Sequence, residues 1–300
     1  MYYTGFADEG GTSIEAQIKV TQELGWTNIE SRNIDGTNIH DLSDEAFDTV
    51  AIKLDAAGVK VNCFGSVIAN WAAQITSPFE ETLTQIERTL PRMQRLGSKL
   101  IRIMSYAVLK DEQDNDCPDQ MKEERFRRLR EMVRLFSDAG ITPVHENCMN
   151  YGGMSYQHTL ELIDNVPGLK LVFDTGNPVF TDDRTKPAPY PKQSSWEFYS
   201  KVKEHVAYVH IKDASFVADR PGETFPESHF TFPGEGDGDV KRIVKDLVNN
   251  GYSGGISIEP HMALVHHDKN QVSTEDLKAS TYIEYGRRFM QLLAEIGGGQ

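Results

Sequence analysis

Four side chains of metal-binding type stand at or near the ends of four successive apolar segments: Glu146, Asp174, His210 and Glu259. A carboxylate buried at the end of a strand is unfavourable unless a cation or hydrogen-bond donors compensate it. Three carboxylates and one imidazole favour a hard or borderline divalent ion, such as Mn²⁺, Mg²⁺, Co²⁺ or Zn²⁺. A single strand-end Asp or His is usually a helix cap or a core residue, but four in succession predict one divalent-metal site.

The elements that must position these residues alternate along the whole chain. Eight apolar segments are expected to be strands: Tyr2–Ala7, Thr27–Ser31, Val59–Gly65, Lys99–Ser105, Ile141–Glu146, Leu171–Asp174, Ala207–Lys212 and Gly255–Glu259. Each is followed by a stretch with helical periodicity: Ser13–Leu24, Ser43–Ala57, Pro78–Leu96, Met121–Ala139, Gln157–Asn165, Ser195–His205, Val240–Asn249 and Thr274–Ile296. Pro91 is expected to bend or break the third helix. The segments from Pro178 to Gln193 and from the seventh strand to Gly238 are expected to be loops.

Regular alternation of strands and helices predicts a parallel sheet of the α/β class. Eight units in 300 residues favour a closed (β/α)₈ TIM barrel that occupies residues 1–300 as a single domain. An open doubly wound sheet would normally show a Gly-rich phosphate loop after its first strand, and residues 6–11 do not fit that pattern. The loops after the last three strands are long, which places the four metal-binding side chains on the catalytic face of the barrel.

Alternation along each strand identifies further candidates around the metal site. If Glu146 points into the barrel, its neighbour His145 points outward to the helices. Lys212 shares the side of His210, and Arg102 points inward from the fourth strand, so either can contact substrate or neutralise the acidic site. The candidate substrate-binding residues are Lys212, Arg102, Asn177 and Glu9, and Glu30 is also expected near the pocket. His261, His266 and His267 follow the last strand and suggest a second metal site, but loop histidines on an acidic protein are usually solvated, and we expect these three to be so.

Composition limits the partners of this protein. The formal net charge of –14 and the pI of about 5.1 argue against a nucleic-acid partner, although a local basic pocket can still hold one phosphate. The three cysteines, Cys63, Cys117 and Cys148, show neither disulfide nor metal-type spacing, and no apolar run reaches membrane-spanning length. Nor does the amino terminus show a signal peptide. We expect a cytoplasmic protein that binds a small-molecule sugar or polyol ketone, does not bind nucleic acid or membranes, and can form a homo-oligomer.

Four short motifs carry a family resemblance. They are Val-His-Glu-Asn at 144–147, Phe-Asp-Thr-Gly-Asn at 173–177, Val-His-Ile-Lys-Asp at 209–213 and Ser-Ile-Glu-Pro-His at 257–261. They resemble the metal-site motifs of the xylose isomerase-like barrel superfamily, which includes sugar-phosphate isomerases and epimerases, ketose 3-epimerases, inosose dehydratases and family-2 apurinic endonucleases. The resemblance implies that Glu146, Asp174, His210 and Glu259 bind one divalent metal ion.

The resemblance also implies a reaction. In the epimerases of this superfamily two metal-bound glutamates, here Glu146 and Glu259, act as base and acid through a metal-stabilised enediolate. The implied activity is therefore isomerisation or epimerisation of a sugar or sugar phosphate. A dehydratase of the inosose type is the alternative, because the same enediolate can expel a hydroxyl group.

Two more distant alternatives are a metal-dependent endonuclease and a non-catalytic sugar-binding barrel. Asn177 stands where the ketose 3-epimerases and the endonucleases carry a histidine, and neither the third nor the fourth strand has one. This pattern argues against the trinuclear zinc site of the endonucleases. A binding-only barrel has no need of both acid–base glutamates, so their presence favours an enzyme.

Overall fold

The barrel is formed by eight parallel strands, as the sequence predicts. The computed structural model describes residues 1–220, 222–223, 225–263 and 273–297. The barrel strands are β1 (Tyr2–Gly5), β2 (Asn28–Ser31), β5 (Lys60–Gly65), β6 (Leu100–Ile103), β7 (Thr142–Glu146), β8 (Lys170–Asp174), β9 (Val206–Ile211) and β12 (Gly255–Ile258). Their order in the sheet is β1-β12-β9-β8-β7-β6-β5-β2, and a parallel bridge between Phe6 and Glu30 joins the two edges.

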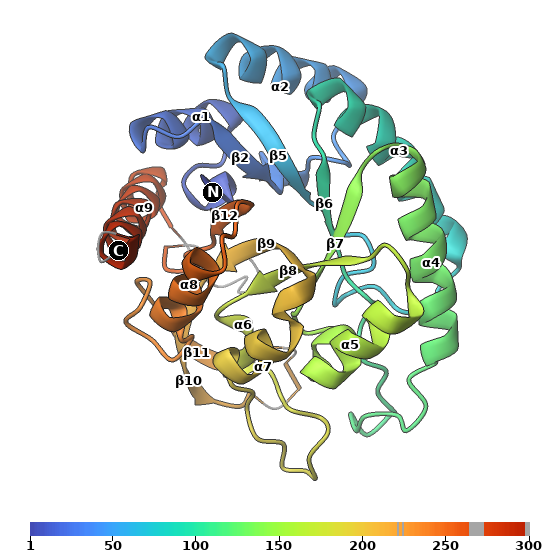
Figure 1. Ribbon diagram of the computed structural model, residues 1–300. Helices are drawn as coiled ribbons and strands as arrows, with labels where there is room; N and C mark the ends of the chain where they lie inside the picture. Colours follow the sequence, from blue (N-terminus) through green and yellow to red (C-terminus); the bar gives the residue numbers. More distant parts are fainter. Residues whose placement is uncertain (221, 224, 264–272, 298–300) are drawn as a thin grey trace.

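Helices surround the strands on the outside (Figure 1). They are α1 (Ile14–Glu23), α2 (Asp44–Ala57), α3 (Phe79–Leu96), α4 (Lys122–Asp138), α5 (Tyr156–Asn165), α7 (Ser195–Val202), α8 (Val240–Asn249) and α9 (Glu275–Gly297). Local signals set their ends. The hydroxyl group of Ser43 accepts the N–H of Ala46 at the start of α2, and Gly58 ends that helix in the left-handed conformation, at φ 67°. No helix in the described ranges is both long and apolar enough to cross a membrane.

Inward-facing side chains form an apolar layer beneath the carboxyl ends of the barrel strands. Val144, Val172 and Tyr208 pack together with Cys63, and all four are buried. The first three lie two residues before Glu146, Asp174 and His210, so the same strand faces that fill the barrel interior present the polar residues at its mouth. His145 points the other way, as predicted, and its Nε2 lies 3.0 Å from the Ser105 hydroxyl.

The break that was one of the two outcomes expected at Pro91 does not occur, because α3 continues through it. Pro91 and Glu87, whose carbonyl group loses its helical partner, both lie on the exposed face of α3. Water can therefore satisfy that carbonyl group, and the missing hydrogen bond does not end the helix.

Two expected loops contain regular structure. The segment after β9 folds back as an antiparallel hairpin of β10 (Asp213–Ala218) and β11 (Glu227–Thr231), and α6 (Asn177–Phe180) follows β8. A second small hairpin, β3 (Asn33–Ile34) and β4 (Thr37–Asn38), follows β2. These additions stand on the carboxyl side of the barrel strands and build up the walls of the site.

Candidate metal centre

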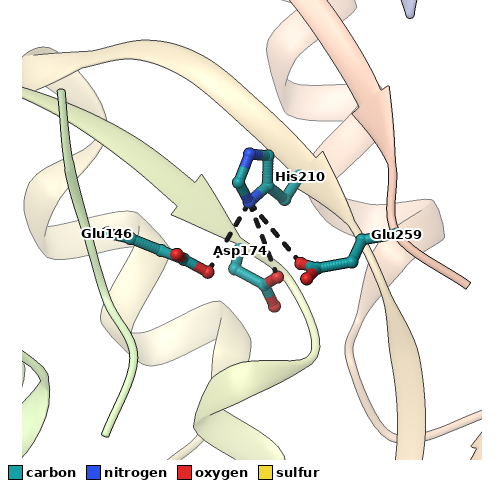
Figure 2. Close-up of side chains that lie close together, drawn as sticks. All are labelled: Glu146, Asp174, His210 and Glu259. Carbon is teal, nitrogen blue, oxygen red and sulfur yellow. Dashed lines mark ion pairs between the residues drawn. The ribbon is translucent and has the colours of Figure 1, made fainter. Parts of the chain in front are cut away.

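The four predicted metal ligands lie together at the carboxyl ends of their strands. Glu146 ends β7, Asp174 ends β8, His210 lies in β9 and Glu259 follows β12 directly. One ligand atom from each lies within 4.8 Å of the others, and all four residues are buried. The Nδ1 atom of His210 is 3.6 Å from Glu146 Oε1, 3.9 Å from Asp174 Oδ2 and 3.6 Å from Glu259 Oε2. Figure 2 shows the three carboxylates turned toward that nitrogen.

Three of the four atoms that face one another are left without hydrogen bonds, and the fourth, Glu146 Oε1, accepts from the Asn177 amide. Within the described part of the chain, His210 Nδ1, Asp174 Oδ2 and Glu259 Oε2 are buried and have no hydrogen-bond partner. Buried acceptors without hydrogen bonds cost about 1–3 kcal/mol each, and the ion pairs of Asp174 Oδ2 and Glu259 Oε2 with Lys212 offset part of that cost. A divalent cation among them would satisfy these atoms together, and their chemistry suits an ion that accepts both oxygen and nitrogen ligands. The residues present therefore fit one metal ion.

Glu30 orients the imidazole ring of His210. Its Oε2 lies 3.0 Å from His210 Nε2 and also accepts from the hydroxyl groups of Tyr208, at 3.0 Å, and Ser257, at 2.6 Å. With the Nε2 proton directed to Glu30, the Nδ1 lone pair faces the carboxylates, as a metal-binding histidine requires. Burial opposes the charged ring, but Glu30 and Glu146 outweigh it and raise the pKa of His210 to about 10. A metal would therefore replace a proton at Nδ1.

Each of the two candidate acid–base glutamates is paired with an arginine. Arg102 Nη1 donates to Glu146 Oε2 at 3.0 Å, and Arg32 Nη1 donates to Glu259 Oε1 at 3.1 Å. Both guanidinium groups lie over the ring of Phe6, at 5.1 and 4.2 Å from its centroid. Each arginine thus takes one oxygen of its glutamate and leaves the other directed at the cluster.

Neighbouring cationic groups keep both glutamates ionised. Burial by itself would raise the pKa of Glu146, but Arg102 and His210 outweigh it and bring the value to about 2. In the same way Lys212 outweighs burial at Glu259 and holds the pKa of that carboxyl well below its usual range. Either glutamate is therefore in the protonation state of a base.

Lys212 and Asn177 lie at the same cluster. Lys212 Nζ is 3.1 Å from Asp174 Oδ2 and 2.9 Å from Glu259 Oε2, both ion-pair distances without hydrogen-bond alignment. The side-chain amide of Asn177 donates to Glu146 Oε1 at 3.0 Å and accepts from Lys212 at 3.1 Å. Burial raises the pKa of Asp174 to about 7, against the opposing effect of Lys212. Lys212 and Arg102, which strand alternation pointed into the barrel, and Asn177, which follows the end of β8, thus all lie at the cluster.

Glu9 and His261 form a buried pair next to Arg32. Glu9 accepts from the backbone N–H of His261 at 2.7 Å, lies 2.9 Å from its Nδ1, and also accepts from Arg32 at 3.0 Å. The prediction that His261 is solvated is wrong, because the side chain is buried and lies in the wall of the cavity beside Glu259. Its backbone adopts a left-handed φ of 53°, which Glu9 stabilises from the other end of the sequence. His266 and His267 lie outside the described residues.

Sequence reasoning missed Arg32, and it placed Glu30 only near the pocket. Arg32 is in the loop directly after β2, where a charged residue usually reaches solvent. The sequence signal for Glu30 was its place near the end of a strand, as for the metal ligands themselves. Its distinct role, behind His210 rather than at the cluster, depends on neighbours from β9 and β12.

The fold and the cluster define a class of protein: a (β/α)₈ barrel with a carboxylate–imidazole site at the carboxyl ends of its last strands. The sequence profile of the family described as "Xylose isomerase-like TIM barrel" matches residues 18–283. The chain belongs to that family. None of the curated proteins compared with this sequence matched it.

Solved structures share the fold at low sequence identity. The chain is similar to a xylose isomerase-like TIM barrel protein from Mycobacterium smegmatis in complex with magnesium, at 18% identity and TM-score 0.66, over 98% of this chain and 97% of that chain. It is also similar to the probable 3-DHS dehydratase AsbF of Bacillus anthracis, at 16% identity and TM-score 0.65, over 94% of this chain and 97% of that chain. A third similar structure is that of a D-tagatose 3-epimerase-like protein, at 17% identity and TM-score 0.65, over 98% of this chain and 99% of that chain.

Proposed function

We propose that this protein is a divalent-metal-dependent isomerase or epimerase that acts on a sugar or a related polyol ketone. The observation that carries the proposal is the pair Glu146 and Glu259. Both are ionised, both are held by an arginine, and both direct one oxygen at the same cluster. Similarity to an epimerase-like protein and to one crystallised with magnesium supports the same reading.

Different residues would bind the metal ion, transfer protons and orient the substrate. Glu146, Asp174, His210 and Glu259 would hold the ion, which when bound supplies positive charge to offset the negative charge that develops on the substrate oxygens. One of Glu146 and Glu259, both ionised in the free protein, would take the proton from the carbon next to the carbonyl group. The other would return a proton on the opposite side after taking it up from solvent, and the first would release its proton to solvent before the next turnover. Arg102, Lys212 and Asn177 would orient the substrate hydroxyl groups, and Glu9 holds Arg32 and His261 in place beside them.

The test incubates a ketose with the metal-loaded protein in deuterated water and uses NMR to monitor the exchange of deuterium into the sugar. Glu146→Gln and Glu259→Gln are each expected to abolish exchange while circular dichroism shows an intact fold. Glu45→Gln, an exposed change on α2, serves as the control and should exchange normally. Exchange that persists in either site variant at full metal occupancy would contradict the acid–base assignment, and no exchange with any ketose in wild type would favour a binding-only barrel.

Dehydration is the second candidate, because one similar structure is a probable dehydratase. Removal of the same proton can be followed by loss of a hydroxyl group instead of reprotonation. Mass spectrometry separates the two reactions, since loss of water lowers the product mass and epimerisation leaves it unchanged.

A further inference from the structure

A second cavity adjoins the metal centre. The inner chamber has a volume of about 280 Å³ and includes Glu146 and Glu259 in its wall. The outer chamber has a volume of about 490 Å³. Trp71, Cys148 and Phe180 belong to both walls, so the two chambers lie side by side.

The sizes of the chambers suggest a ligand with two parts. Pockets for small molecules usually span roughly 300–1,000 Å³ and enclose most of the ligand surface. The inner chamber lies just below that range, which suits one sugar ring next to a metal ion. The outer chamber is larger than the inner one, and a lone monosaccharide at the metal would leave it filled with water.

The charged groups in the outer wall are paired with one another. Its four described cations and four described acids form ion pairs: Lys110 with Asp114 at 2.9 Å, Lys192 with Asp182 at 2.7 Å and with Asp219 at 2.6 Å, Arg184 with Asp182 at 3.6 Å, and Arg220 with Glu223 at 3.6 Å. A phosphate group is bound where cations are left to pair with it. Among the described residues, the outer wall offers it no surplus positive charge.

The cations in the wall of the inner chamber are also paired with acids. Arg102 is bound to Glu146, Arg32 to Glu259, and Lys212 lies between Asp174 and Glu259. Phosphate binding there would require breaking a buried ion pair, which leaves a carboxylate uncompensated. The basic residues of the inner wall are therefore engaged in holding the acidic cluster, and they do not form a phosphate pocket.

Apolar side chains cover part of the outer wall. Val108, Met149 and Met154 belong to it, together with Trp71, whose ring meets Phe225 edge-on at 5.0 Å between centroids. Such a surface packs against the apolar face of a ring, while the paired charges around it offer donors and acceptors for hydroxyl groups. This mixture suits an uncharged sugar ring.

We propose that the site takes an uncharged two-ring sugar, with the reacting ketose in the inner chamber and a second sugar ring in the outer chamber. The proposal rests on the proposed function, because the metal centre fixes which ring lies inside. It specifies the substrate as a glycosylated ketose, not a sugar phosphate or a free monosaccharide.

Binding to the metal-loaded protein tests this, with three probes that differ only at one end of the same ketose: D-fructose, isomaltulose and D-fructose 6-phosphate. Isothermal titration calorimetry is expected to show that isomaltulose binds about tenfold or more tightly than fructose, because burial of a second ring adds contact area. Fructose 6-phosphate is expected to bind no more tightly than fructose.

A variant that fills the outer chamber locates the second ring. Val108 lies in the outer wall but not in the inner one, so Val108→Trp should bring the ratio of isomaltulose to fructose affinity down to about one. Ile52→Trp, at a position 61% exposed on α2, is the matched control and should keep the wild-type ratio.

Any of four results would overturn the two-ring proposal. They are equal affinities for the three sugars, tighter binding of fructose 6-phosphate than of fructose, no binding of isomaltulose, and an unchanged affinity ratio in Val108→Trp. Deuterium exchange into fructose distinguishes this failure from failure of the proposed function. Exchange that depends on metal and on Glu146 would leave the isomerase assignment standing even when the two-ring proposal falls.

Discussion

Substitution of Glu30 is predicted to weaken metal binding without removing a metal ligand. Glu30 is fully buried and contacts the Nε2 atom of His210, but it is not one of the four residues whose atoms converge. The Glu30→Gln substitution keeps the size of the side chain and removes its charge. The amide keeps one uncharged carbonyl oxygen, which can still accept from His210, Tyr208 and Ser257 in the place of Oε2, and it puts an NH2 donor in the place of Oε1, 3.2 Å from His210 Nε2.

The magnitude follows from the role of this hydrogen bond. Loss of a carboxylate that orients a metal-binding histidine typically costs 10–100-fold in metal affinity, which corresponds to about 1.4–2.7 kcal/mol. We expect Glu30→Gln to weaken Mn²⁺ or Zn²⁺ binding by that factor, because a neutral amide accepts the Nε2–H of His210 less strongly than a carboxylate does and makes the ring a weaker ligand. Substrate affinity measured at saturating metal should change much less, since Glu30 lies behind His210.

Competition with a chelating dye measures the metal dissociation constant directly. Glu45→Gln, with the same chemical change at an exposed position, controls for the loss of one negative charge. Thermal unfolding of the metal-free proteins shows whether the variant is folded before any metal is added. If folded Glu30→Gln binds metal as tightly as wild type, His210 is not oriented by Glu30 and the argument for the metal centre loses its main geometric support.

Two further predictions concern the whole protein. Saturating metal should stabilise it against unfolding, by about 2.7 kcal/mol at a free metal concentration one hundred times the dissociation constant, and a chelator should reverse the effect; an unfolding midpoint that does not depend on metal would contradict the site. Stability should also fall as the pH drops from about 6.5 to 4, because burial lowers the pKa of His145 to about 4 while the unfolded chain takes up protons near 6.5. Below the folded pKa both states are protonated and the loss levels off, at about 3 kcal/mol for this one residue. His145→Gln should flatten the pH dependence of the unfolding free energy in urea titrations, whereas exposed His229→Gln should leave it unchanged; equal slopes for His145→Gln and wild type would show that His145 is not held neutral.

Particular residues show how far local pattern determined the fold. Apolar runs, glycine helix ends and serine caps predicted the barrel strands and the surrounding helices to within two residues, except that the helix expected over Ser195–His205 ends as α7 at Val202 and continues as a 3-10 turn over Lys203–His205. The sequence could not decide whether Pro91 breaks α3, because the effect depends on which face of the helix the proline occupies, and that is decided by packing. The hairpin β10–β11 was missed because its strands pair outside the main sheet and do not follow the strand–helix alternation.

The sequence by itself determined that carboxylates and an imidazole ring meet at one end of the barrel. Parallel strands all end at the same face and side chains alternate along them, so a residue type at a strand end already has a position in space. Only the tertiary structure decided how those groups are held: which nitrogen of His210 faces the carboxylates, which glutamate pairs with which arginine, and that His261 is buried. Those choices depend on contacts such as Arg32 with Glu259 and Glu9 with His261, between residues more than two hundred positions apart, and no local pattern in the sequence encodes them.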